Sequence, residues 1–327
     1  MSVSTRRSPA PETVGRIPDF LIVGHPKCGT TALYEMLRRR PEIYMPENKE
    51  PWFFARELHE HTPPRPDGTP RTLAEYMAWF TAAGPEQIVG EASPHYLWSA
   101  TAAEHIARVN PDARIIAIFR EPASFLRSLH LQFLEVYYET EADLRRALEL
   151  EEDRRAGRNV PRYTYWPQLL LYSEHIRYVE QLRRYHAVFP PEQVKVLIYE
   201  DFRADNVGTM REVLGFLGVD AEGPIEAVRA NPTVRPRSQL LNELVHAVGV
   251  GRGPFSRMVK ESIKAVTPKG PRQAAFTAVR RRLVFGAPEP PDEELMAELR
   301  WRFRGETKAL GEYLGRDLLA SWGGEQP

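Results

Sequence analysis

One stretch near the N-terminus, DFLIVGHPKCGTTAL at residues 19–33, most constrains what this chain can fold into. Phe20 to Gly24 has the composition of a strand, a turn follows at residues 25–29, and the apolar spacing of a helix begins at Thr30. The first amides of a helix have no partner inside the helix, and the helix dipole adds positive charge there, so such a loop is suited to a phosphate-like anion. The stretch therefore predicts a strand, an anion-binding loop and a helix in that order.

The position of the lysine separates this loop from those of nucleotide triphosphatases. Such loops read G-x-x-x-x-G-K-[ST], with the lysine directly after the second glycine and a hydroxyl residue that holds magnesium. Gly24 and Gly29 keep the spacing, but Thr30 stands in the lysine position and Lys27 lies inside the turn. We interpret the loop as phosphate-binding without ATP hydrolysis. A nucleotide kinase or triphosphatase with a degenerate loop, and a non-catalytic nucleotide-binding module, are the alternatives.

Strand and helix patterns alternate through the rest of the chain. Apolar runs at 113–119 and 194–199 are typical of strands buried in a parallel sheet. A single helix is expected from Pro167 to His186, and an acidic, solvated helical segment over 139–153. With no internal repeat, the alternation predicts an α/β fold with a doubly wound parallel sheet flanked by helices, in a strand order that the sequence leaves open.

Composition limits the partners. The chain has 327 residues, with 44 basic and 44 acidic side chains, so no overall field attracts nucleic acid. No window reaches the ~18 apolar residues of a membrane helix. Residues 1–16 are polar and lack the apolar core of a signal peptide, so we expect a disordered tail. Cys28 is the one cysteine, which fits a reducing compartment, and we expect a cytoplasmic protein. The sequence does not indicate its oligomeric state.

Two further places offer phosphate and proton chemistry. Arg120 ends the strand at 113–119, and Ser128 follows two turns into the next helix. Ligands of open α/β sheets bind at the carboxyl ends of strands, so this pair is expected to meet a second phosphate. Glu50 stands between charged residues and the aromatic run at 52–54, where a carboxylate at a cleft edge can act as a general base.

The loop PKCGTTAL at 26–33 and the Arg120-x7-Ser128 pair together resemble the sulfotransferases that use PAPS (3′-phosphoadenosine 5′-phosphosulfate), and the likeness runs from about residue 18 to 322. It implies a P-loop-like fold in a single sulfotransferase domain over 17–325, with 231–290 as an irregular basic lid on the substrate side. It also implies PAPS as co-substrate, 3′,5′-ADP as product and no metal.

The resemblance also assigns roles to individual residues. Lys27 would stabilise the leaving oxygen, and the 5′-phosphate would be held at the start of the helix by Cys28, Gly29, Thr30 and Thr31. The remaining nucleotide contacts are the 3′-phosphate ligands Arg120 and Ser128, the adenine neighbour Tyr199, and two arginines of a late loop, Arg235 and Arg237.

The acceptor side resembles the carbohydrate sulfotransferases of the heparan type. KEPWFF at 49–54 matches their segment with a glutamate base, which makes Glu50 the expected base and His95 the reserve. Glu91-Ala92-Ser93 matches a second heparan-type segment, with Ala92 where lysine is usual. Bacterial sulfotransferases of natural products or lipids share the pattern, so the acceptor is expected to be a hydroxyl of a carbohydrate, lipid or natural product.

Overall fold

The computed structural model describes residues 15–59, 69–162, 164, 166–228, 235–236, 285–286 and 288–323. Nearly all of the predicted tail 1–16, most of the basic segment 231–290, and Arg237 lie outside these residues. The described chain divides into a first unit of residues 15–25, 29–119 and 181–228, and a second unit made of the remainder. A single domain over 17–325 stays a prediction.

The first unit contains a five-stranded parallel sheet in the order β2-β3-β1-β4-β5. Its strands are β1 (Phe20–Gly24), β2 (Ile43–Tyr44), β3 (Ile88–Ala92), β4 (Arg114–Phe119) and β5 (Val194–Ile198). In the centre of the sheet, Ile22 lies opposite Ala92 on β3 and Ile116 on β4. After β1 the chain crosses to the edge strand β2, returns to β3 beside β1, and then passes to the other side of β1 through β4 and β5. Strands thus lie on both sides of β1, as in a doubly wound sheet, and the predicted fold class is confirmed.

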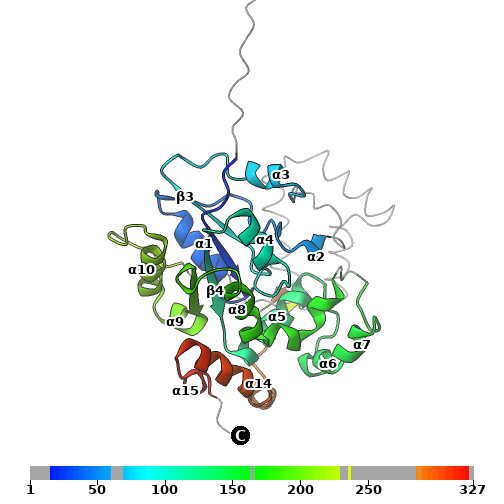
Figure 1. Ribbon diagram of the computed structural model, residues 1–327. Helices are drawn as coiled ribbons and strands as arrows, with labels where there is room; N and C mark the ends of the chain where they lie inside the picture. The colour runs from blue at the N-terminus through cyan, green and yellow to red at the C-terminus, as the bar shows by residue number, and fades with distance from the viewer. Residues whose placement is uncertain are drawn as a thin grey trace, which may run out of the picture. The chain divides into compact units, whose positions relative to one another are not determined.

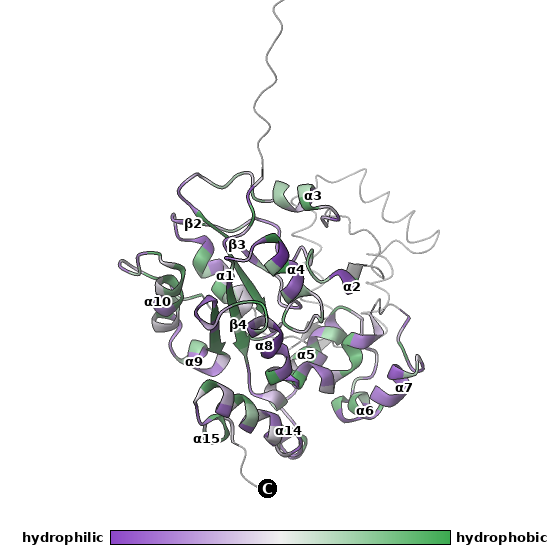
Figure 2. Ribbon diagram, viewed as in Figure 1, coloured by the Kyte–Doolittle hydropathy of each residue, from purple (hydrophilic) through white to green (hydrophobic). Residues whose placement is uncertain are grey.

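The sheet forms because its strands are apolar on both faces. All five residues of β1 are buried, as are those of β4 after Arg114, and Figure 2 draws these strands in green. Helices of the same unit flank the strands (Figure 1): α1 (Thr30–Arg38), α2 (Arg56–His59), α3 (Leu73–Ala78), α4 (Ala102–Val109), α9 (Tyr199–Ala204) and α10 (Asn206–Leu217). The apolar spacing of α1 buries Leu33, Met36 and Leu37.

The second unit is mainly helical. It contains α5 (Pro122–Glu135), α6 (Leu144–Glu149), α7 (Glu151–Arg155), the 3-10 helices η1 (Pro167–Leu170) and η2 (Tyr172–Ile176), α14 (Glu293–Leu314), α15 (Leu318–Trp322), and the short antiparallel pair β6 (Arg235–Pro236) and β7 (Phe285–Gly286). The Glu121 carboxylate caps α5 by accepting hydrogen bonds from the N–H groups of Ala123 and Ser124. Helix α5, which carries Ser128, packs against α14.

The expected single helix from Pro167 to His186 is wrong. The chain instead makes η1, η2 and then α8 (Tyr178–His186). Carboxylates take backbone N–H groups that a continuous helix would use internally: Glu151 accepts from Ser173 at 2.8 Å, and Glu306 accepts from Val179 at 2.7 Å. Tertiary partners therefore replace the regular ladder, which a 3.6-residue pattern does not reveal.

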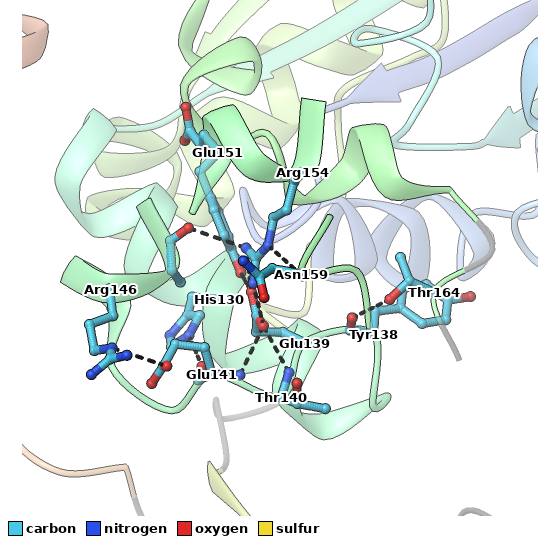
Figure 3. A network of polar contacts seen from close by, with 12 residues as sticks. His130, Tyr138, Glu139, Thr140, Glu141, Arg146, Glu151, Arg154, Asn159 and Thr164 are labelled. Atoms are coloured by element: carbon cyan, nitrogen blue, oxygen red, sulfur yellow. Dashed lines mark hydrogen bonds and ion pairs between the residues drawn. The ribbon is translucent and has the colours of Figure 1, made fainter. Parts of the chain in front are cut away.

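The expectation of a solvated acidic segment over 139–153 holds at Glu149 and Glu152, which are exposed, but is wrong at Glu139, which is fully buried. Its carboxylate forms two 2.8 Å contacts with the Arg154 guanidinium, whose side chain is 1% exposed (Figure 3). Glu139 also accepts hydrogen bonds from two backbone N–H groups and the Tyr172 hydroxyl. Arg154 in turn donates to the carbonyl oxygens of Ala147 and Asn159. The pair thus ties the end of α5 to α6, α7 and η2.

Removing one member of this pair leaves a buried charge without its partner. We expect Arg154→Met to lower the free energy of unfolding by about 3–5 kcal/mol, and the double variant Glu139→Gln/Arg154→Met to be less destabilised than Arg154→Met alone. Urea unfolding measures both. The exposed Arg155→Met is the control and should match the wild type. A double variant no more stable than Arg154→Met would contradict the buried-charge explanation.

Candidate active site

The start of α1 in the first unit has the geometry of an anion site. The first intrahelical bond runs from the Leu33 N–H to the Gly29 carbonyl, so the N–H groups of residues 30–32 precede it. Gly29 has φ 86°, and a Cβ there would lie 3.0 Å from Phe202 Cδ1 and 3.3 Å from Tyr199 Cδ2. Only glycine meets both demands. The predicted adenine neighbour Tyr199 therefore lies beside the predicted phosphate loop.

The second unit brings together three other residues that are predicted to contact PAPS. Arg120 Nη1 donates to the Lys27 carbonyl and to Ser128 Oγ, both at 2.9 Å. Lys27 itself has φ 61° and is half-buried. Burial lowers the pKa of its ammonium, the charge of Glu135 opposes that shift, and Arg120 adds to it. The seven-residue spacing of Arg120 and Ser128 thus correctly indicates a pair, while its phosphate stays a prediction.

The candidate base Glu50 lies in a segment that is docked on the end of β3. The Glu50 N–H donates to the Ala92 carbonyl at 3.2 Å, and the Trp52 N–H donates to Ser93 Oγ at 3.2 Å. The Phe54 N–H donates to the Tyr96 hydroxyl at 3.3 Å. Glu50 and Trp52 both have positive φ, 65° and 53°, so this backbone depends on the contacts that hold it.

Lys49 connects this segment to the first turn of α1, a link that sequence reasoning missed. Its Nζ donates to Thr31 Oγ1 at 3.0 Å, lies 3.3 Å from Glu50 Oε1, and sits 5.8 Å from the centre of the Tyr34 ring. Thr31 in the first turn of α1 and the candidate base therefore share one ammonium. The available signal was that Lys49 directly precedes Glu50.

Glu91 is a second carboxyl group near Glu50 that sequence reasoning did not assign a role. It is fully buried in β3 and accepts hydrogen bonds from the hydroxyls of Tyr76 at 2.7 Å and Tyr96 at 3.2 Å. Burial raises its pKa to about 7, the hydrogen bonds of Ser93 and the two tyrosines oppose that rise, and the charge of Glu50 adds to it. The signal was a carboxylate inside the apolar run IVGEA.

His95, the reserve base, is buried beside Trp52, with ring centroids 5.6 Å apart in an edge-to-face arrangement. Burial lowers the pKa of its imidazole, the charge of Glu50 opposes this, and Lys49 adds to it. Its Nδ1 has no hydrogen-bond partner within the part of the chain that the structure describes. Both Glu50 and His95 thus stay candidates for the base.

The other predicted site residues are located less fully. Thr30 and Cys28 are buried, whereas Arg235 is described only as backbone of β6 and Arg237 lies outside the described residues. Within the described ranges, no three His, Cys, Asp or Glu side chains gather as a metal site would require. No helix in those ranges combines the length and the apolar character needed to cross a membrane.

Comparisons with known proteins identify the family of this chain. Residues 18–223 match the model of the Sulfotransferase family. Carbohydrate sulfotransferase 15 of Mus musculus is 27% identical over 267 residues, and heparan sulfate glucosamine 3-O-sulfotransferase 3B1 of the same species is 29% identical over 206. These matches cover 68% and 62% of the chain but 47% of each relative, so the chain spans about half the length of the curated relatives it matches.

A solved structure extends the likeness to nearly the whole chain. The crystal structure of a sulfotransferase from Alicyclobacillus acidocaldarius superposes with a TM-score of 0.64 and 26% identity, over 94% of this chain and 99% of that one. The P-loop-like fold is therefore shared with that structure.

The buried Glu91 carboxyl makes stability depend on pH. Its pKa is about 7 when folded and 4.5 in the ordinary reference, so the folded state binds the proton more tightly. The resulting stabilisation is fully present below the unfolded pKa and is lost as pH rises through the folded one. Relative to Glu91→Gln, we expect the wild type to lose about 3 kcal/mol of unfolding free energy from about pH 4 to about pH 8.

Urea unfolding across this pH range measures the difference. The exposed α4 variant Glu104→Gln is the control and should follow the wild-type profile. Parallel profiles for wild type and Glu91→Gln would show that the Glu91 carboxyl titrates normally in the folded protein.

Proposed function

The chain belongs to the sulfotransferase family, and on that premise we propose that it transfers a sulfuryl group from PAPS to an acceptor hydroxyl, releasing 3′,5′-ADP. One observation carries the proposal: the Lys49 ammonium contacts both Thr31 at the anion loop and the Glu50 carboxylate. A transfer reaction needs a donor site and a base in the same place. A nucleotide-binding module needs no base.

The donor is assigned residue by residue. Amides at the start of α1, with Thr30 and Thr31, hold the 5′-phosphate, and the Tyr199 ring beside Gly29 supports the adenine. Arg120, with Ser128 at 2.9 Å, binds the 3′-phosphate. Arg235 and Arg237 are proposed as further 3′-phosphate ligands from the family resemblance alone.

The reaction is an in-line displacement at sulfur. The acceptor oxygen forms a bond to sulfur while the bond from sulfur to the 5′-phosphate oxygen breaks, and the bonding pair stays on that oxygen. Glu50 takes the acceptor proton, and Lys27 stabilises the charge that grows on the leaving oxygen. Positioning and charge stabilisation carry this chemistry, as they do in phosphoryl transfer.

A carbohydrate hydroxyl is the proposed acceptor, and the names of the two mouse relatives support this choice. Lipid and natural-product hydroxyls are the next candidates, and an amine follows them. A cytoplasmic location stays a prediction.

The two catalytic assignments make separate predictions. We expect Lys27→Ala to slow transfer by about 10²–10³-fold because a charge-stabilising donor is lost, and Glu50→Gln to slow it by about 10²–10⁴-fold because proton transfer is lost. Glu50→Gln should keep its affinity for 3′,5′-ADP. The assay uses ³⁵S-labelled PAPS with heparosan and chondroitin oligosaccharides, and mass spectrometry detects the added sulfuryl group.

The exposed variant Glu104→Gln is the matched control for Glu50→Gln. Full activity in Glu50→Gln would move the base to His95 or elsewhere. A wild type that binds PAPS but sulfates no acceptor in a wider hydroxyl panel would favour the non-catalytic binding module.

The 3′-phosphate site makes an independent prediction. We expect Arg120→Ala to weaken 3′,5′-ADP binding by about 10–100-fold, because a charged hydrogen bond to phosphate contributes about 1.5–3 kcal/mol. Binding of 5′-AMP, which lacks the 3′-phosphate, should change little. Calorimetric titration compares both ligands, with exposed Arg108→Ala as control. An equal loss for both nucleotides would show that Arg120 supports the loop through the Lys27 carbonyl instead.

A further inference from the structure

The Lys49 side chain is held in place within the first unit. It is 17% exposed, and its ammonium is shared by a hydroxyl, a carboxylate and the face of an aromatic ring. A lysine that served only as a surface charge would extend into water, where an ion pair contributes little. The neighbouring backbone is fixed as well, because Glu50 is bonded to Ala92 and Trp52 to Ser93.

The two polar partners of Lys49 mark the two ends of the reaction. Thr31 lies in the first turn of α1, where the proposed function places the 5′-phosphate, and Glu50 is the proposed base for the acceptor. In an in-line transfer the sulfuryl group passes between the 5′-phosphate oxygen and the acceptor oxygen. The ammonium contacts Thr31 Oγ1 at 3.0 Å and Glu50 Oε1 at 3.3 Å, so it lies next to both groups between which the proposed function moves the sulfuryl group.

We propose that Lys49 is a second catalytic lysine, whose ammonium binds an oxygen of the sulfuryl group as it moves from donor to acceptor. The inference rests on the proposed function and adds to it a ligand for the transferred group itself. PAPS binding replaces the Thr31 hydroxyl by a sulfonate oxygen at the ammonium, while the contact with Glu50 is retained. Lys49 keeps its proton throughout and forms no covalent bond.

This role differs from that of Lys27 in the atom it serves. Lys27 stabilises the bridging oxygen that leaves with the phosphate, whereas Lys49 stabilises the oxygens that travel with sulfur. 3′,5′-ADP contains the 5′-phosphate but no sulfuryl group. A comparison of PAPS with 3′,5′-ADP therefore distinguishes the role of Lys49 from that of Lys27. Loss of the Lys49 ammonium should weaken the binding of PAPS and leave the binding of 3′,5′-ADP nearly unchanged.

The test compares dissociation constants of PAPS and 3′,5′-ADP by calorimetric titration, and needs no acceptor. We expect Lys49→Met to weaken PAPS binding by about tenfold relative to 3′,5′-ADP, because one charge-assisted hydrogen bond is lost. Lys49→Arg keeps the cation and should restore most of the difference. Lys195→Met is the matched control, since Lys195 also pairs with a glutamate in the first unit, and it should leave both constants unchanged.

Two results would overturn the inference while leaving the proposed function intact. One is an equal loss of affinity for both ligands in Lys49→Met, which would show that Lys49 only supports the start of α1 through Thr31. The other is an unchanged affinity for both ligands. A wild type that binds neither PAPS nor 3′,5′-ADP would overturn the proposed function, and the Lys49 inference with it.

Discussion

The sheet of the first unit is apolar on both faces, and this constraint decides where chemistry can occur. The residues of β1 and most of those of β4 are buried, so polar side chains can enter only where strands end. Gly29 opens α1 a few residues after β1, and the base segment is bonded to the end of β3. Glu91 inside β3 is a fully buried carboxyl group within a strand, and two tyrosine hydroxyls make it tolerable.

The local part of this organisation is readable from the sequence. The strand Phe20–Gly24, the helix from Thr30 and the contact of Arg120 with Ser128 each follow from residues close together in the chain. Periodicity and spacing report such short-range geometry directly. Gly29 belongs to the same short-range pattern, since its left-handed backbone is one that glycine adopts without strain.

The rest depends on contacts between distant residues. The carboxylates of Glu151 and Glu306 that interrupt the expected helix come from α7 and α14, and Lys49 finds its place only after Thr31 and Glu50 are brought together. The burial of Glu139 is the sharpest case, because an acidic run ordinarily means a solvated face. A buried arginine partner allows the glutamate to lie in the interior instead, and no pattern along the chain predicts that partner.

The Glu139–Arg154 pair also limits how this protein can change over generations. Each member satisfies the charge of the other in the buried interior, so replacing either one first passes through an unstable intermediate. Two simultaneous replacements by apolar or neutral residues avoid that step, but they require two mutations at once. We therefore expect Glu139 and Arg154 to be kept or replaced together, whereas the exposed ion pairs around them can change one residue at a time.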